Sequence, residues 1–148
     1  MTEKEKFLLI KDLCARLPYN LVINCTEEDD EKTNFDCFLA PDMIKDIKSE
    51  TSYWIIKPYL RPLSSMTKEE RKEFLTLLLD KHSYLFYIDD NGVINGKSTD
   101  IFGEGINSVL FSSENVSQYI DWLNKKGFDY RGLIPMGLAL EASDDMYR

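Results

Sequence analysis

The sequence has little of what catalytic and metal sites are usually made from. Its 148 residues include one histidine, His82, and three cysteines, Cys14, Cys25 and Cys37. No CxxC or HxxxH pair is present, which excludes the common zinc sites, and no GxSxG motif marks a nucleophile. The glycine pair at 103 and 105 lacks a third glycine and encloses a glutamate, whose charge would repel phosphate. We therefore expect no catalytic residue, no metal and no cofactor.

The cysteines are odd in number and widely spaced, which argues against a secreted disulfide scaffold. We expect all three to be reduced and mostly buried as small hydrophobic side chains. The alternative is a reactive thiol, and Cys25 is the candidate because it ends a predicted strand beside a loop. His82 follows a predicted helix, whose negative end favours a cation. An enzyme with a site near His82 or Cys25 is our third hypothesis for the function.

Long apolar runs are also missing. The longest cover residues 74–79 and 133–140, far short of the roughly 20 residues that cross a bilayer. The first ten residues lack the apolar core and the small-residue cleavage site of a secretory signal. The sequence therefore predicts a cytoplasmic protein without a membrane partner.

The chain does contain an excess of negative charge and a full share of hydrophobic side chains. It has 26 Asp and Glu against 18 Lys and Arg, a net charge of −8, and 43% of its residues are hydrophobic. These values predict a single domain over 1–148 and argue against a disordered chain or a polybasic nucleic-acid binder. Residues 27–31 are all acidic. This run is either a solvated hairpin loop or a docking site for a basic partner.

The order of apolar and turn residues predicts an α+β fold, a small, mainly antiparallel β-sheet with about three helices packed on one side. The first helix begins at a capping box of Thr2 and Glu5 and ends before Pro18. Its predicted buried face holds Phe7, Ile10, Leu13, Cys14 and Leu17. The other expected elements are strands over 19–25, 34–39, 53–56, 84–88 and 93–95, and helices over 67–81 and 113–126. Residues 41–50 fit a short helix or a bulged strand, and 106–111 fit one more strand.

Two boundaries follow from local chemistry. The buried strand 53–56 is expected to stop at Lys57-Pro58, and residues 57–62 should be extended and polyproline-like because each proline restricts the residue before it. The last residues, from Glu141, are expected to fray.

Residues 57–72 carry a net positive charge, although the chain as a whole is acidic. They include five Lys and Arg against two Glu, and Tyr59 stands between the cations Lys57 and Arg61. Tyr130 and Arg131 form a similar pair. Cations beside aromatic rings suit the recognition of a macromolecule, so these five residues are our predicted partner-binding surface. A small nucleic-acid-binding module that uses 57–72 is the alternative function.

Three segments of the sequence resemble segments of other proteins. They are KDLCARLPY at 11–19, IKPYLRPLSSMT at 56–67, and WLN at 122–124 followed by FDYRGLI at 128–134. They resemble a group of uncharacterised proteins from Bacteroides-type gut bacteria and their phages or mobile elements. The resemblance reaches both ends and the middle of the chain but not residues 81–111. It implies an origin rather than an activity, and no catalytic residue is carried over from it.

The leading hypothesis is a non-enzymatic intracellular accessory protein, encoded by a phage or mobile element, that binds a macromolecular partner. A protein partner is favoured over a nucleic acid because the chain is acidic. The sequence predicts no oligomeric state.

Overall fold

The computed structural model describes residues 1–29, 33–48, 53–78, 86–88, 94–96, 116–143 and 145–147. These residues form two compact units. The first unit combines Met1–Arg61 with Asn124–Arg148, and the second is Pro62–Leu123. The single domain expected over 1–148 stays a prediction.

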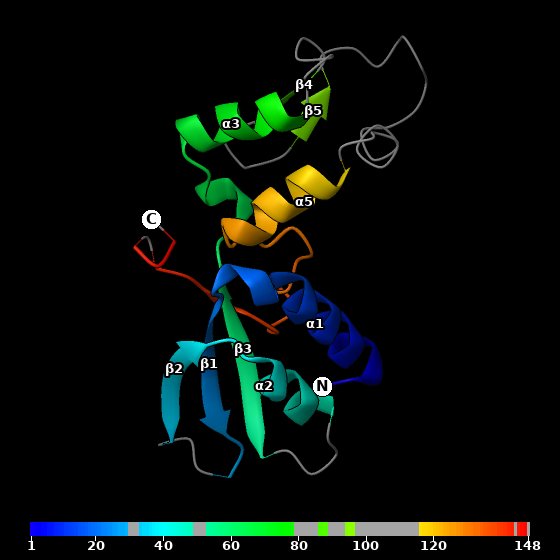
Figure 1. The fold of residues 1–148 in the computed structure, drawn as a ribbon, viewed down its shortest axis with the longest axis vertical. Coiled ribbons are helices and arrows are strands. Elements are labelled where there is room, and N and C mark those ends of the chain that lie inside the picture. The colour runs from blue at the N-terminus through cyan, green and yellow to red at the C-terminus, as the bar shows by residue number, and fades with distance from the viewer. Residues whose placement is uncertain are drawn as a thin grey trace. The chain divides into compact units, whose positions relative to one another are not determined.

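The first unit is built on a four-stranded sheet (Figure 1). Its strands are β1 (Val22–Glu27), β2 (Asn34–Phe38), β3 (Trp54–Leu60) and β6 (Leu140–Glu141), in the order β2-β1-β3-β6. β1 pairs antiparallel with both β2 and β3, and only β6 runs parallel to its neighbour. The fold is therefore α+β with a mostly antiparallel sheet, as the sequence predicts.

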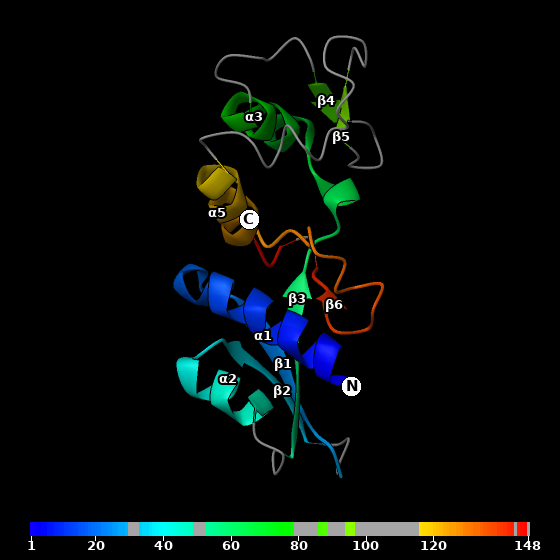
Figure 2. The same cartoon turned by 90° about the vertical axis from the view of Figure 1, so that its right-hand side faces the viewer.

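Two helices, α1 (Glu3–Arg16) and α2 (Pro41–Lys48), cover one face of this sheet (Figures 1 and 2). Alternate strand residues point towards them, because successive side chains of a strand point to opposite faces. The core therefore combines Leu9 and Leu13 of α1 and Ile44 and Ile47 of α2 with strand residues such as Ile23, Cys25, Ile56 and Leu60. The ambiguous segment 41–50 thus contains a helix. The opposite face of the sheet is open to solvent at Asp36, Phe38 and Ile55.

The capping box predicted for α1 is confirmed. The Glu5 backbone N–H donates to the Thr2 hydroxyl at 3.3 Å, and the Thr2 backbone N–H donates to the Glu5 carboxylate at 2.7 Å. The predicted buried face of α1 is wrong in part, because Phe7 is 69% exposed and Cys14 is also exposed. The helix does bury the predicted Leu13, and with it Leu9, Asp12 and Arg16, which were not predicted. Two of these residues form an ion pair, which hydrophobic periodicity counts as polar and assigns to solvent.

β3 runs through Lys57-Pro58 to Leu60, so the predicted stop at this proline is wrong. Glu28 N–H donates to Tyr53 C=O at 2.7 Å, which shows that the odd-numbered residues of β3 direct their backbone groups at β1. The nitrogen of Pro58 therefore points away from β1, and its missing N–H breaks no hydrogen bond of that ladder. The start of the strand is also less buried than expected, since Tyr53, Trp54 and Ile55 are exposed.

The C-terminal residues are held rather than frayed. β6 pairs with β3, and Ala142 N–H donates to Leu60 C=O at 2.8 Å. The Tyr147 hydroxyl donates to Tyr59 C=O at 2.6 Å. The expectation of fraying from Glu141 is therefore wrong through residue 147, apart from position 144, which lies outside the described residues.

The second unit contains α3 (Lys68–Leu78), a hairpin of β4 (Phe86–Ile88) and β5 (Ile94–Gly96), and most of α5 (Val116–Lys125). The predicted capping box before α3 is confirmed, because Thr67 and Glu70 exchange side chain–backbone hydrogen bonds of 3.0 and 3.1 Å. Phe74 of α3 packs against Tyr119 and Trp122 of α5. The predicted hairpin is confirmed, and the strand expected at 106–111 lies outside the described residues.

Candidate binding surface

Lys57 and Tyr59 lie on the open face of the sheet, where the predicted surface begins. Lys57 is opposite Asn24 of β1, and Asn24 is opposite Asp36 of β2. The Tyr59 hydroxyl donates to Asp36 Oδ1 at 3.1 Å, and Asn24 Nδ2 donates to the same oxygen at 2.8 Å. Burial, and next the hydrogen bond to Asp36, raise the pKa of Tyr59. The hydroxyl therefore stays protonated and fixes a polar row across three strands.

Arg61 follows β3 and is used within the fold. Its guanidinium lies over the ring of Phe128, 4.3 Å from the ring centre. Its backbone N–H donates to Gly127 C=O, and its C=O accepts from Asp129 N–H, both at 2.8 Å. These contacts join the end of β3 to the segment that returns after α5.

Tyr130 and Arg131 are drawn inward as well. Arg131 Nη1 donates to Asp12 Oδ1 at 3.2 Å, and its side chain is only 18% exposed. The Tyr130 hydroxyl donates to Asn124 Oδ1 at 3.1 Å, and burial is the main cause of its raised pKa. In the described part of the chain, no hydrogen bond, ion pair or ring contact joins Lys57 or Tyr59 to Tyr130 or Arg131. The five predicted residues therefore form two groups with different neighbours.

The centre of the inward group is a buried ion pair that the sequence analysis missed. Arg16 Nε donates to Asp12 Oδ2 at 2.7 Å, and both side chains are fully buried. Arg16 Nη2 also donates to Phe128 C=O at 2.8 Å. Asp12 therefore faces two guanidinium groups, those of Arg16 and Arg131. The only signal in the sequence was the i, i+4 spacing of Asp12 and Arg16, which is also typical of exposed helix pairs.

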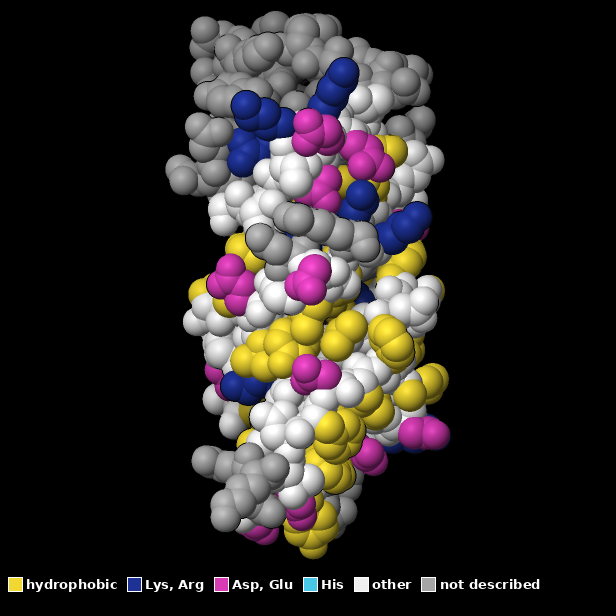
Figure 3. Space-filling view, turned by 90° about the vertical axis from the view of Figure 1, so that its left-hand side faces the viewer, with side chains coloured by type: hydrophobic (Ala, Val, Ile, Leu, Met, Phe, Trp, Pro, Cys, Tyr) yellow, Lys and Arg dark blue, Asp and Glu magenta, His cyan; other side chains and the backbone are white. Residues whose placement is uncertain are grey.

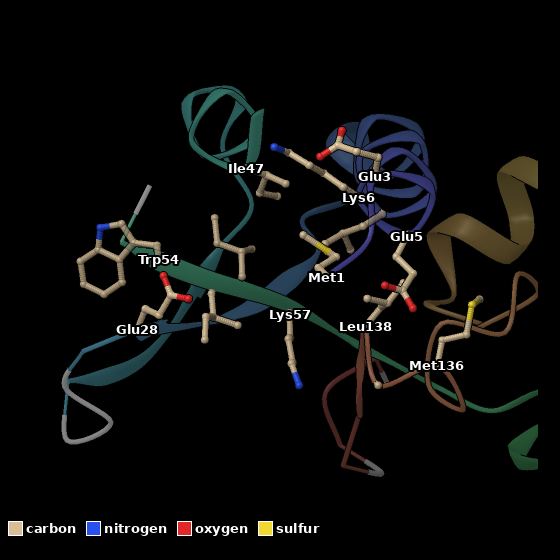
Figure 4. Close-up of a pocket in the computed structure, with 14 residues that line it drawn as sticks. Met1, Glu3, Glu5, Lys6, Glu28, Ile47, Trp54, Lys57, Met136 and Leu138 are labelled. Carbon is tan, nitrogen blue, oxygen red and sulfur yellow. The ribbon is translucent and has the colours of Figure 1, made fainter. Parts of the chain in front are cut away.

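A groove of about 650 Å³ lies beside the first turns of α1, in the first unit (Figure 4). β3 forms one side of it, and α1, the end of α2 and residues 136–138 form the others. Figure 4 shows Trp54 and Glu28 at one end, Met136 and Leu138 at the other, and Met1 between them. Its apolar lining includes Met1, Leu9, Ile47, Trp54, Ile56 and Met136. Segments that lie far apart in the sequence build this groove, so no local sequence pattern pointed to it.

The charged residues of the groove are mainly acidic. Glu3, Glu5 and Glu28 line it together with Lys6 and Lys57. The backbone N–H of Thr2 donates to Glu5 and lowers the pKa of its carboxyl, which therefore stays ionised at neutral pH. Glu28 belongs to the acidic run 27–31, whose last two residues lie outside the described part of the chain. The run thus contributes at least one carboxylate to the groove.

Exposed aromatic side chains lie next to the groove, at the end of β3 that carries Trp54. Trp54 of β3 meets Phe35 of β2 edge to face, with ring centres 5.5 Å apart. Both rings are partly exposed, and neighbouring Tyr53 is exposed too. Figure 3 shows hydrophobic side chains gathered over the strands on the side of the sheet where β2 lies, with acidic side chains between them. This end of the first unit is therefore apolar and acidic at once.

The remaining cations of 57–72 belong to the second unit. Lys68 and Lys72 of α3 are exposed, but so are Glu69 and Glu73 on the same helix. Glu69, Lys72 and Glu73 also line a hollow of about 410 Å³ along that helix. This stretch of α3 therefore presents both signs of charge.

The candidate catalytic residues receive no support. Cys25 is buried in β1, with its Sγ 3.9 Å from Cys37 Sγ, and burial raises its pKa to about 12. Burial and the raised pKa do not favour a reactive Cys25, because the thiolate is the nucleophile, and the hypothesis of a site near Cys25 stays a prediction. All three cysteines are free, but Cys14 is exposed rather than buried. His82 lies outside the described residues.

The described residues contain no cluster of three or more His, Cys, Asp or Glu side chains placed to bind a metal ion. The helices in the same part of the chain are all too short or too polar to span a bilayer. These findings concern only the ranges given above.

Comparison with known proteins adds no relative. No family model matches the chain, and no curated protein or solved structure matches it. A function for the groove thus depends on the groove's own residues.

Proposed function

We propose that the protein is non-enzymatic and binds a protein partner in the groove beside α1. The partner is a basic segment with apolar side chains that fill the groove. The observation that carries this proposal is a groove of about 650 Å³ whose lining combines apolar side chains with three carboxylates. Intracellular location and a phage or mobile-element origin remain part of the proposal, and the sequence alone supports them.

The apolar lining supports binding because exposed apolar surface on one side of a folded unit usually marks an interaction site. Trp54 and Met136 both line the groove, and Met136 is 42% exposed. Tryptophan often dominates binding energy, and methionine adapts its shape to different partners. Both side chains therefore suit the recognition of apolar anchors.

The charges support a basic partner. Glu3, Glu5 and Glu28 attract Lys and Arg side chains and repel phosphates. The net charge of −8 acts in the same direction at long range. A nucleic acid, the alternative partner, would be repelled both by the carboxylates of the groove and by the net negative charge of the chain.

The test compares two variants that make the same change on and off the groove. Met136→Arg places a bulky cation in the groove, and Phe7→Arg places it on an exposed residue of α1 that does not line the groove. Candidate partners from the source organism are captured on the wild-type protein and identified by mass spectrometry. Each candidate partner is then purified and titrated against the wild type, Met136→Arg and Phe7→Arg. We expect Met136→Arg to weaken the partner at least tenfold, which is about 1.4 kcal/mol, and Phe7→Arg to leave it within twofold.

A partner whose affinity is the same for Met136→Arg and Phe7→Arg would contradict the proposed site. Mobility shifts with single- and double-stranded DNA and RNA address the alternative. A complex that forms at low salt and weakens as salt rises would contradict a protein as the partner.

A further inference from the structure

The outer edge of β2 is a second exposed feature of the first unit, separate from the groove. β2 is the first strand in the sheet order, so in the described part of the chain no strand pairs with its outer side (Figure 1). An unpaired edge presents a row of backbone N–H and C=O groups that can pair with another chain.

The backbone groups on this edge follow from two hydrogen bonds. Glu27 N–H donates to Thr33 C=O at 3.1 Å, and Leu39 N–H donates to Leu21 C=O at 2.8 Å. The odd-numbered residues of β2 therefore point their backbone groups at β1. By the same alternation, Asn34, Asp36 and Phe38 direct theirs outward. Three consecutive outward positions are enough to pair with a short extended segment.

β2 has few of the features that keep edge strands from pairing. Natural edge strands are usually protected by lysine, proline or a bulge. Residues 34–38 contain no lysine or proline, and their register with β1 is continuous. Phe38 is 65% exposed on the open face, and Phe35 is exposed on the helix-covered face. The one charge on the strand, that of Asp36, therefore decides which segments can pair with it.

One carboxylate oxygen of Asp36 accepts no hydrogen bond from the described residues. Its Oδ1 accepts from both Asn24 Nδ2 and Tyr59 Oη, while its Oδ2 takes part in no hydrogen bond among the described residues. The side chain is exposed and fixed by these two donors. A Lys or Arg side chain on the same face of an added strand lies opposite or diagonal to this oxygen.

From these observations we infer that β2 accepts an extended segment of another protein as an additional strand, in which basic residues alternate with apolar ones. The basic side chains lie on the open face beside Asp36, and the apolar ones lie on the other face beside Phe35. A second copy of this chain fits less well. Antiparallel pairing centred on β2 would place Asp36 opposite Asp36 of the other copy, and like charges directly opposite destabilise a strand pair.

The probe is a fluorescein-labelled nine-residue peptide, KVKVKVKVK, titrated against the full chain and followed by fluorescence anisotropy at low salt. The control peptide EVEVEVEVE has the same alternation with the opposite charge. A third peptide carries the lysine sequence with an N-methyl group on every residue, which removes the N–H groups of both edges. We expect the lysine peptide to bind at least tenfold more tightly than either control.

Two variants of the protein separate strand addition from contact with the ring of Phe38. Phe38→Pro removes one outward N–H and no hydrogen bond to β1, and Phe38→Thr removes the ring but keeps the N–H. We expect Phe38→Pro to bind the lysine peptide at least tenfold more weakly than Phe38→Thr. Circular dichroism shows whether Phe38→Pro folds, and if it does not, the N-methylated peptide decides the question.

Equal binding of the lysine peptide and its N-methylated form would overturn strand addition. Equal binding of the lysine and glutamate peptides would overturn the role of Asp36. Sedimentation that shows a dimer of Phe38→Thr but not of Phe38→Pro would assign the edge to a second copy instead. The groove proposal is tested separately by Met136→Arg, which changes no residue of β2.

Discussion

Asp12→Asn removes one negative charge from the interior of the first unit and leaves two positive charges beside it. Asp12 accepts from Arg16 Nε at 2.7 Å, from Arg16 Nη2 at 3.2 Å and from Arg131 Nη1 at 3.2 Å. The asparagine keeps the shape but cannot neutralise a guanidinium. Arg16 is fully buried and cannot turn to solvent, whereas the partly exposed Arg131 can adjust.

The loss of stability is large because of this burial. Removing one partner of a buried ion pair usually costs about 3–5 kcal/mol, since the other charge is left uncompensated. Replacing both partners with apolar residues of similar size is often close to neutral. We therefore expect Asp12→Asn to lose about 3–5 kcal/mol of unfolding free energy, and the double variant Asp12→Leu, Arg16→Met to recover most of it.

Urea unfolding followed by circular dichroism measures both effects. With a slope of about 2 kcal/mol per molar urea, a loss of about 3–5 kcal/mol lowers the unfolding midpoint by about 1.5–2.5 M. An Asp12→Asn midpoint within about 0.5 M of the wild type would refute this reasoning. So would a double variant that is less stable than Asp12→Asn.

Three further predictions concern single groups. Burial raises the pKa of Tyr147 to about 12, so the phenol ionises first in the unfolded chain. The free energy of unfolding should therefore fall by up to about 2–3 kcal/mol as pH rises from about 10 to 12. Urea titrations of Tyr147→Phe should lack this part of the pH dependence. Iodoacetamide at pH 8 should label the exposed Cys14 first and Cys25 only after unfolding, as peptide mass spectrometry would show, and equal labelling rates would contradict its burial. Gly127→Ala should reduce the stability by at least about 1–2 kcal/mol and lower the thermal unfolding midpoint accordingly. The reason is that Gly127 has φ +73° and the new methyl group would lie 2.9 Å from the Tyr147 ring. An unchanged midpoint would contradict this packing.

Local chemistry made much of the fold predictable. Both capping boxes, at Thr2 and Thr67, involve residues three apart, and the hairpin of β1 and β2 is also local. Burial was harder to predict. The buried face of α1 contains Asp12 and Arg16, and β3 continues through Pro58 because its nitrogen points away from β1. Both depend on which neighbour each residue meets in the folded chain.

The candidate surface was less predictable for the same reason. Arg131 is a cation beside an aromatic residue in the sequence, yet its partner Asp12 is 119 residues away. Lys57 and Tyr59 do reach the open face of the sheet, because alternation along a strand is a local property. The groove joins residues at the start of α1 with Glu28, Ile47, residues 54–57 and residues 136–138, and no local pattern connects those segments.

The paired backbone hydrogen bonds between Arg61 and residues 127 and 129 also define where the chain leaves and re-enters the first unit. Because exit and return are adjacent, with 2.8 Å between donor and acceptor in each hydrogen bond, the chain leaves the first unit before residue 62 and rejoins it after residue 123 at one place. A change in the number of residues between these two points would alter the closure entropy of the first unit only slightly, since loop closure depends weakly on length. The sheet that carries the groove and the β2 edge is thus closed by the hydrogen bonds of Arg61 to residues 127 and 129, and its closure depends little on the length of the chain between them.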